Sequence, residues 1–310
     1  MVRVVVTGCC GRIGKGVVAE LSGRGHVVTG IDVTAAPSSL RAHMASFVRG
    51  DLAQEGVADI VAGAEAVIHL AACPDDADFF SRLLEPNIMG VVRVLQACAA
   101  HDVPRVLVAS SGKVMVGYNG QPVSKYPLNQ GTDPAPRDLY CATKLFAEAA
   151  TQAHAHASAG RSQCVCVRFA WCPRTTADAS ALEAVSEGGM GRDEYLSPAD
   201  AGRCCACFVE AKLPSDFVYE TVYCASRVTA NGTPRFDLEP ARRLFGFEPR
   251  DVYPDGVSEI VQDCDYSPPI GLFPGTAAAA GKRGASSGGN SIDGKLIKHE
   301  ERKEPVPEPE

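Results

Sequence analysis

The sequence predicts an α/β protein with a doubly wound parallel sheet and a small C-terminal lobe. Short β-branched segments alternate with longer segments of helical apolar periodicity from residue 1 to residue 169. The first segment, residues 1–7, is typical of a strand buried in a parallel sheet. We predict strands at residues 1–7, 26–31, 46–49, 66–70, 105–109 and 163–169.

A glycine-rich turn follows the first strand and opens a helix that reaches about residue 23. Glycines let the backbone turn sharply and approach a pyrophosphate, whose charge meets the free N–H groups at the helix N-terminus. The alternative is a tight turn without a ligand. The turn residues that we expect to contact a dinucleotide are Gly8, Gly11, Arg12, Ile13 and Gly14.

The second, third and fourth strands would end at one carboxyl edge, where open α/β sheets bind ligands. The second ends at Asp32, about twenty residues after the glycine turn, where a carboxylate can accept both ribose hydroxyls of the adenosine half. That acid also repels a 2′-phosphate, so NAD is favoured over NADP. The next two strand ends carry Asp51, which can bond the adenine amine, with Leu52, and the small turn Leu70-Ala71-Ala72.

A Tyr and a Lys lie four residues apart in a predicted helix at 138–159, so Tyr140 and Lys144 share one face. An ammonium near a phenol stabilises the phenolate and lowers the pKa of the Tyr, which can then act as a base near neutral pH. The fifth strand leads to Ser110-Ser111, and Ser111 is the better candidate to position a substrate oxygen. The alternatives are a surface Tyr–Lys pair and, for Ser110, a cap at the strand end.

A long helix is predicted at residues 79–101, with Asn87 inside it. Asn87 is a candidate cofactor contact; the alternative is a buried polar group bonded to backbone. Beyond residue 169 the sequence is rich in turns, with a helix start at Ser197, a strand at 218–225 and a helix at 237–247. We predict a nucleotide-binding core at 1–169, a small substrate-binding lobe at 170–265 and a disordered tail at 276–310.

Composition excludes several classes of protein. The chain has 310 residues and a net charge of -7 without a basic stripe, which argues against nucleic acid as the main partner. It has no apolar run long enough to cross a membrane and no export signal before the first strand, so we expect a cytoplasmic protein. Its 13 cysteines lack the spacing usual for zinc, so we expect reduced thiols that pack in the core and no metal.

Taken in order, these motifs resemble the extended short-chain dehydrogenase/reductase superfamily, in its NAD-dependent epimerase/dehydratase group. The resemblance covers about residues 1–260. It rests on Thr7-Gly8-x-x-Gly11-x-x-Gly14, Asp32, Gly50-Asp51-Leu52, His69-Leu70-Ala71-Ala72, Asn87, Ser110-Ser111 and Tyr140-x3-Lys144. It implies a Rossmann-type fold, an NAD cofactor and catalysis by Ser111, Tyr140 and Lys144, with Lys144 also bonding the nicotinamide ribose.

Within that group the sequence is most similar to uronate dehydrogenases, which oxidise free hexuronic acids with NAD. Where these enzymes carry Ser-Ser-Asn-His, this chain has Ser110-Ser111-Gly112-Lys113, and Trp171 replaces a small polar residue after the sixth strand. An Arg that clamps the uronate carboxylate is expected nearby. The candidate substrate contacts are therefore Ser110, Gly112, Trp171, Arg174 and Arg192.

The resemblance implies an oxidoreductase of carbohydrate metabolism that transfers a hydride between NAD and a sugar or sugar-acid carbinol. Two alternatives stay open, a nucleotide-sugar epimerase or dehydratase that uses the same Ser111, Tyr140 and Lys144, and a dinucleotide-sensing protein without catalysis. The helices at 79–101 and 138–159 can pair across a two-fold axis, as in relatives, so a homodimer is one expected assembly.

Overall fold

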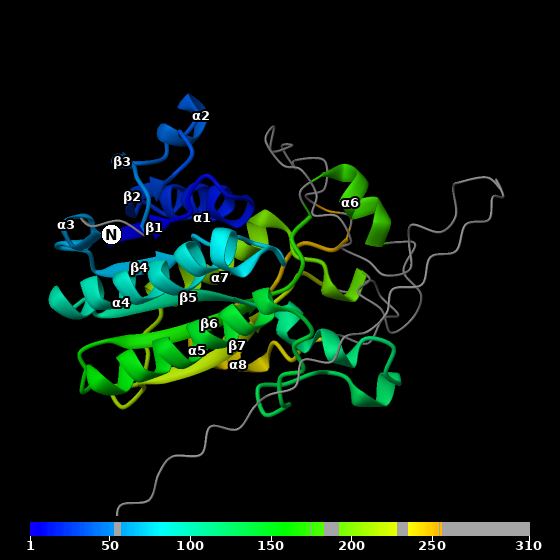
Figure 1. Cartoon of the computed structure of the whole chain (residues 1–310). Coiled ribbons are helices and arrows are strands. Elements are labelled where there is room, and N and C mark those ends of the chain that lie inside the picture. Colours follow the sequence, from blue (N-terminus) through cyan, green and yellow to red (C-terminus); the bar gives the residue numbers. More distant parts are fainter. Residues whose placement is uncertain (53–56, 174, 183–191, 228–234, 254, 256–310) are drawn as a thin grey trace, which may run out of the picture. The chain divides into compact units, whose positions relative to one another are not determined.

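Seven parallel strands form one sheet in the order β3-β2-β1-β4-β5-β6-β7 (Figure 1). The computed structural model describes residues 1–52, 57–173, 175–182, 192–227, 235–253 and 255. The strands are β1 (Arg3–Thr7), β2 (Val27–Asp32), β3 (Ser46–Arg49), β4 (Ala66–His69), β5 (Arg105–Ser111), β6 (Gln163–Phe169) and β7 (Tyr219–Cys224). The predicted fold class and the seven predicted strands are confirmed.

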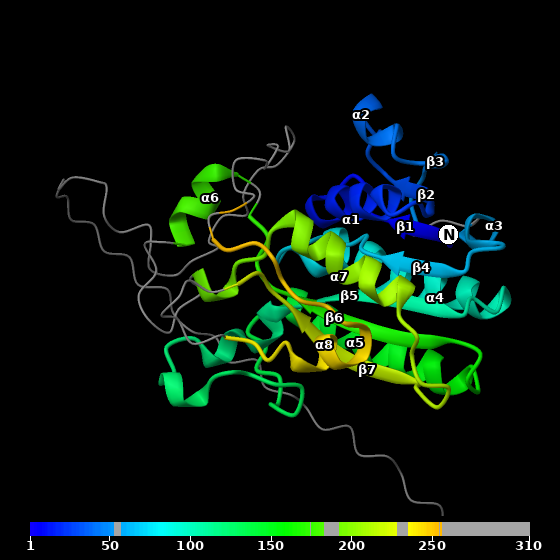
Figure 2. The same cartoon turned by 180° about the vertical axis from the view of Figure 1, so that it is seen from behind.

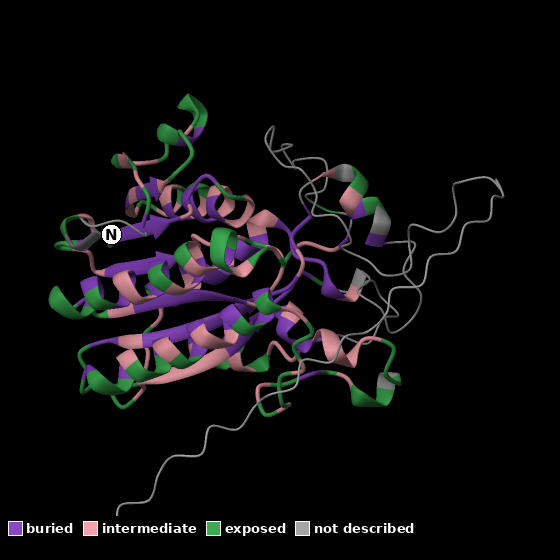
Figure 3. Cartoon of the chain, in the orientation of Figure 1, coloured by how far each residue is buried: buried purple, intermediate pink, exposed green. Residues whose placement is uncertain are grey.

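Helices cover both faces of the sheet, as a doubly wound fold requires. In β1, Val4 and Val6 face one core cluster, while Val5 between them faces the other. The first cluster packs against α1 (Arg12–Gly23), α7 (Pro198–Glu210) and α8 (Glu239–Phe245). The second packs against α3 (Val57–Val61), α4 (Gly90–Ala100) and α5 (Leu139–Ala157), and Figures 1 and 2 show these two layers. The central strands β1, β4, β5 and β6 are mostly buried, whereas β3 is not (Figure 3).

The carboxyl ends of the strands meet at one edge of the sheet. Thr7 at the end of β1 pairs with Ile31 in β2 and with His69 in β4. Farther along the sheet, Ser111 at the end of β5 pairs with Phe169. This edge therefore carries the glycine turn, Asp32, the turn after β4 and the serine pair, which the sequence separates by up to a hundred residues.

The helix predicted at 79–101 is two elements rather than one. Its first part, η1 (Phe79–Met89), is a wide helix of the π type, and only the second part is the regular helix α4. Pro86 lies inside η1. Proline has no N–H to donate and its ring crowds the carbonyl four residues back, so a regular helix cannot continue through it. The N–H of Gly90 accordingly bonds the carbonyl of Glu85, five residues back.

Capping residues begin the later helices where the sequence predicts them. Asp138 accepts the Cys141 N–H at 2.8 Å and starts α5, and Ser197 accepts the Asp200 N–H at 2.9 Å and starts α7. Gly246, with φ 69°, ends α8 in the left-handed region. The remaining short helices are α2 (Ser38–Arg41), η2 (Gly112–Tyr118), η3 (Val123–Lys125), α6 (Thr176–Ala181) and η5 (Arg192–Glu194).

The segment after residue 169 completes the sheet as well as forming the region beyond it. β7 pairs with β6 along its whole length, so the described part of this segment belongs to the same compact unit as the rest of the sheet. A separate substrate-binding role for residues 170–265 stays a prediction, and the predicted tail at 276–310 lies outside the described residues. Within the described chain, none of the helices has the length and apolar character that a bilayer crossing requires.

Candidate active site

The glycine turn brings two backbone segments into direct contact at the carboxyl edge. Gly8 has φ 67°, and a Cβ placed on it would lie 2.6 Å from the Ala71 nitrogen. A Cβ on Gly14 would lie 2.1 Å from the Gly8 carbonyl oxygen. Gly11 caps α1 without a side-chain hydrogen bond, and Arg12 and Ile13 form its first turn without an acidic residue. The helix N-terminus is therefore open to an anion such as a phosphate.

Asp32 stands at the end of β2 beside this turn. Its two carboxylate oxygens accept the N–H groups of Cys10 at 2.9 Å and Thr34 at 2.8 Å. These bonds orient the carboxylate while leaving each oxygen a lone pair for a hydroxyl. The N–H of Gly50 bonds the Asp32 carbonyl, which places the turn with Asp51 and Leu52 next to it. The predicted adenosine contacts thus gather on one side of the glycine turn.

Asn87 holds the turn after β4 in place. Its side-chain oxygen accepts the Cys73 N–H at 2.7 Å, and its side-chain nitrogen donates to the Cys73 carbonyl at 3.1 Å and to the Thr143 hydroxyl at 3.0 Å. Asn87 is 1 % exposed. The structure thus gives Asn87 the alternative role, a buried amide bonded to backbone, and a direct cofactor contact stays a prediction.

His69 is a buried imidazole beneath the same turn. Its Nδ1 bonds the Thr7 hydroxyl at 2.7 Å, and Thr7 also accepts the N–H groups of Leu70 and Ala71, which precede Ala72, at 3.2 Å. Its Nε2 finds no hydrogen-bond partner among the described residues. Burial and the charge of Lys144 lower the pKa of His69 to about 3, so the ring is neutral at physiological pH. Because His69 is neutral, the positive charge near Tyr140 in this part of the site comes from Lys144.

Ser111, Tyr140 and Lys144 converge at the end of β5. Tyr140 is 6 % exposed and its hydroxyl hydrogen-bonds to Ser111. The Lys144 ammonium lies 5.7 Å from the centre of the Tyr140 ring and donates to the Ala109 carbonyl at 3.1 Å. The helical spacing predicted this grouping, and the structure brings all three side chains together.

The pKa of Tyr140 differs from the prediction. Burial raises it above its usual value, against the opposing effects of the Ser111 hydrogen bond and the Arg12 charge. Burial also lowers the pKa of Lys144, to about 8. Desolvation outweighs the attraction between ammonium and phenolate here because both groups lie in the protein interior and Lys144 is bonded to a backbone carbonyl.

Ser110 points away from this group, since successive strand residues face opposite sides of the sheet. Its hydroxyl donates to the Glu148 carboxylate at 2.5 Å. Arg168 binds that carboxylate through two hydrogen bonds of 2.8 Å and donates to the Tyr223 hydroxyl at 2.9 Å. Ser110 therefore belongs to a buried charged network, and the structure does not bring it to the substrate side.

The predicted substrate contacts are placed only in part. A Cβ on Gly112 would lie 2.9 Å from the ring of Phe236, so that ring occupies the space that a side chain at residue 112 would need. Trp171 pairs with Tyr195 and packs against a small apolar cluster. Arg192 begins η5, and Arg174 lies outside the described residues, so neither is identified as the carboxylate clamp.

Lys113 and Asp138 were not predicted as site residues, yet Lys113 lies at the Tyr140 ring and pairs with Asp138. The Lys113 ammonium is 2.7 Å from an Asp138 carboxylate oxygen and 5.4 Å from the centre of the Tyr140 ring. Their positions in the sequence offered a signal, because Lys113 follows the serine pair and Asp138 is the capping residue two places before Tyr140. Arg12 was expected at a phosphate, and its guanidinium donates to the Cys172 carbonyl.

The described cysteines all carry free thiols and most are buried, as predicted for reduced core residues. Cys9, Cys10 and Asp32 are close enough for their ligand atoms to lie within 4.8 Å of one another, a cluster that the sequence did not indicate.

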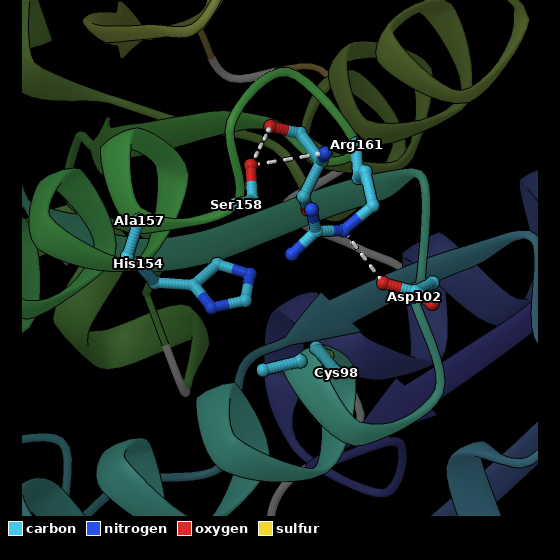
Figure 4. Close-up of a pocket in the computed structure, with 8 residues that line it drawn as sticks. Cys98, Asp102, His154, Ala157, Ser158 and Arg161 are labelled. Atoms are coloured by element: carbon cyan, nitrogen blue, oxygen red, sulfur yellow. Dashed lines mark hydrogen bonds and ion pairs between the residues drawn. The ribbon is translucent and has the colours of Figure 1, made fainter.

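A hollow at the opposite edge of the sheet, near the ends of α4 and α5, is lined by His154 and an exposed Arg161–Asp102 ion pair (Figure 4). This hollow is remote from Tyr140 and does not belong to the candidate active site.

Replacing Gly14 by Ala is expected to damage the glycine turn. The new Cβ would meet backbone atoms of Gly8 and Cys9, which cannot move aside without displacing β1. We expect a loss of roughly 2 kcal/mol or more in the free energy of unfolding and at least tenfold weaker NAD binding. Gly23 is the control, because it lies in the same helix and a Cβ there meets nothing within 4 Å. Urea unfolding and NAD titration should show Gly23→Ala neutral or stabilising by up to about 1 kcal/mol. Equal effects of the two substitutions would contradict the assignment.

Comparison with known proteins agrees with this geometry. Residues 4–172 match the family described as the NAD dependent epimerase/dehydratase family. The L-arabinose 1-dehydrogenase (NAD(P)(+)) of Haloferax volcanii is 27% identical over 263 residues, which are 81% of this chain and 97% of that protein. The uronate dehydrogenase of Pseudomonas putida is 31% identical over 117 residues, 37% of this chain and 43% of that enzyme. A solved structure of a mutated uronate dehydrogenase superposes with a TM-score of 0.65 at 25% identity, covering 87% of this chain and 90% of that one.

Proposed function

Because the chain belongs to the NAD dependent epimerase/dehydratase family, we propose that it oxidises a carbinol of a free sugar or sugar acid. The observation that carries this proposal is the convergence of Ser111, Tyr140 and Lys144 beside the glycine turn. Relatives that act on small carbohydrates support the substrate class. They include the arabinose dehydrogenase that aligns with most of this chain.

The residues at the carboxyl edge fit a dinucleotide. The close backbone approach at Gly8 and Gly14, the open N-terminus of α1 and the oriented Asp32 carboxylate would hold a pyrophosphate and an adenosine ribose. Lys144 would bond the nicotinamide ribose. Asp32 favours NAD over NADP because its charge repels a 2′-phosphate. NAD held by these residues would supply the hydride acceptor for oxidation of the carbinol.

Tyr140 removes the proton in this reaction. The Ser111 hydroxyl holds the substrate oxygen within reach of the phenol, and the phenolate of Tyr140 takes the hydroxyl proton as the C–H bond breaks. The high pKa of Tyr140 in the buried site means that Lys144, Arg12 and the substrate must together favour the phenolate before turnover. The ammonium of Lys144 is charged below pH 8, which keeps it available for this role near neutrality.

The direct test is NADH formation with L-arabinose, glucuronate, galacturonate and UDP-glucose supplied in turn. We expect NADH with at least one free sugar or sugar acid, and a lower rate with NADP than with NAD. Asp32→Ala should bring the two rates together, because the charge that rejects the 2′-phosphate is gone. Conversion of UDP-glucose to an epimer without net NADH would identify an epimerase instead. NAD binding with no reaction on any of these compounds would favour the non-catalytic alternative.

A homodimer remains part of the proposal. On η1, Phe80 is 78% exposed and Met89 is 36% exposed. η1 packs against α5, and a second copy of the chain would cover the exposed apolar side chains of η1. Sedimentation at several protein concentrations measures the oligomeric state directly.

A further inference from the structure

A second cation lies against the Tyr140 ring. Lys113 follows Ser111 in η2, and its backbone N–H donates to the Ser111 hydroxyl at 3.1 Å. Its ammonium lies 5.4 Å from the centre of the Tyr140 ring, and Lys144 lies 5.7 Å from the same centre. The phenol that the proposed reaction uses as a base therefore has two ammonium groups beside it, one from η2 and one from α5.

Asp138 opposes the charge of Lys113. One carboxylate oxygen lies 2.7 Å from the Lys113 ammonium, and the other accepts the Cys141 N–H at 2.8 Å. Burial alone would raise the pKa of Asp138, but the hydrogen bonds from Cys141 and Lys113 lower it below its usual value. Asp138 is therefore ionised at neutral pH. Because it caps the helix that carries Tyr140, the ion pair is fixed relative to the phenol.

Other charged and titratable groups also act on Tyr140. These groups come from α1, from the turn after β4 and from α5 itself, and they are Arg12, Asp75, Asp76, Cys141 and Lys144. Of these, Cys141 itself contacts Asp138, because its N–H donates to that carboxylate. The side chains of Lys113 and Asp138 are 19% and 15% exposed, so water screens their charges only partly.

We propose that the Lys113–Asp138 pair sets the pH at which Tyr140 becomes a base, with Lys113 favouring the phenolate and Asp138 opposing it. Lys113 and Asp138 are then positioning residues that act through Tyr140. The inference rests on the proposed function, in which Tyr140 accepts the carbinol proton. It predicts shifts of opposite sign for the two partners, since they carry opposite charges. If the ion pair were purely structural, both substitutions would remove the same contact, and the apparent pKa would not shift in opposite directions.

The test is the pH profile of kcat/KM for NAD reduction in Lys113→Met and Asp138→Asn. At the 5.4 Å between the Lys113 ammonium and the ring centre, one partly screened charge shifts a pKa by about one unit. Lys113→Met should therefore raise the apparent pKa of the base by about one unit, and Asp138→Asn should lower it. Asn caps helices as well as Asp does, so α5 should keep its N-terminus. Lys113→Arg should retain the wild-type profile.

Lys212→Met is the matched control. It removes the same charge from an exposed residue just after α7, at the opposite edge of the sheet, and should leave the apparent pKa unchanged. Shifts of the same sign in Lys113→Met and Asp138→Asn, or no shift in either, would overturn the proposal. A shift in Lys212→Met as large as that in Lys113→Met would overturn it too, because it would assign the effect to net charge.

A second readout separates this inference from the proposed function. In NAD-saturated protein labelled with fluorotyrosine, the fluorine NMR signal of Tyr140 is identified by its absence in Tyr140→Phe. Its titration should move to higher pH in Lys113→Met and to lower pH in Asp138→Asn. If wild-type protein reduces NAD with none of the sugars but these shifts appear, the proposed function fails and the charge pair stands. If NAD is reduced but the signal titrates alike in all variants, the charge pair fails alone.

Discussion

Tyr140→Phe is expected to cut the rate of NAD reduction by about 10² to 10⁴ while leaving NAD binding nearly unchanged. Phe keeps the ring beside Lys113 and Lys144, so packing at this 6 % exposed position is preserved. The substitution removes the hydroxyl that bonds Ser111 and the group that accepts the carbinol proton. Turnover is measured by NADH absorbance, and NAD affinity by calorimetry on the same preparations.

Tyr118→Phe is the matched control for that experiment. Tyr118 lies at the end of η2, and its hydroxyl donates to the Asp133 carbonyl at 3.1 Å. The control thus also loses a phenolic hydroxyl and one hydrogen bond, but away from the Ser111 hydroxyl. We expect its rate to stay within about threefold of the wild type, since an ordinary hydrogen bond contributes only about 1 kcal/mol. Retained turnover in Tyr140→Phe would remove Tyr140 from the mechanism.

Glu148→Leu is expected to lower the free energy of unfolding by about 3–5 kcal/mol, a large part of a typical domain's stability. Glu148 is 9% exposed and binds both the Arg168 guanidinium and the Ser110 hydroxyl. Burial alone would lower the pKa of Arg168, but Glu148 raises it above its usual value, so Arg168 keeps its charge. Without Glu148 that charge is left buried and unpaired. Urea unfolding measures the loss.

Two further variants show whether that loss of stability comes from the unpaired charge. Glu148→Leu combined with Arg168→Met replaces both charges by apolar groups, and it should recover most of the stability because no charge remains uncompensated. Glu65→Leu removes a surface ion pair with Arg3, in which the side chains are 63% and 43% exposed. It should cost at most about 1 kcal/mol. A double variant as unstable as Glu148→Leu would show that the network stabilises through its shape rather than through charge balance.

The fold was predictable because its signals are local. Each β-branched segment, each helix cap and the glycine turn depend on residues within one or two turns of chain. This is why strands such as residues 1–7, and the helix starts after Asp138 and Ser197, were predicted close to their observed positions. The wide helix at Phe79–Met89 was missed although Pro86 was visible in the sequence. Apolar periodicity continues across Pro86 and hides the change of hydrogen bonding.

The site was predictable where the spacing of residues along a helix or strand decides which side chains come together. Tyr140 and Lys144 share a helix face, and Ser111 ends a central strand, so their convergence follows from the fold. Ser110 was misplaced, and the backbone contacts of Asn87 were not foreseen, because this spacing does not identify the partner on the other side of the strand or helix. Glu148 holds Ser110, and the backbone of Cys73 holds Asn87.

The order of strands and helices along the chain, the glycine turn at the sheet edge, the position of Asp32 and the Tyr140–Lys144 spacing were all predictable from the amino-acid pattern. All of these are set by backbone geometry over short stretches of chain. Only the tertiary structure decided that burial raises the pKa of Tyr140, that Phe236 fills the space beside Gly112, and that Lys113 and Asp138 pair at the phenol. These outcomes depend on contacts between segments far apart in the chain, and on the desolvation that such contacts impose.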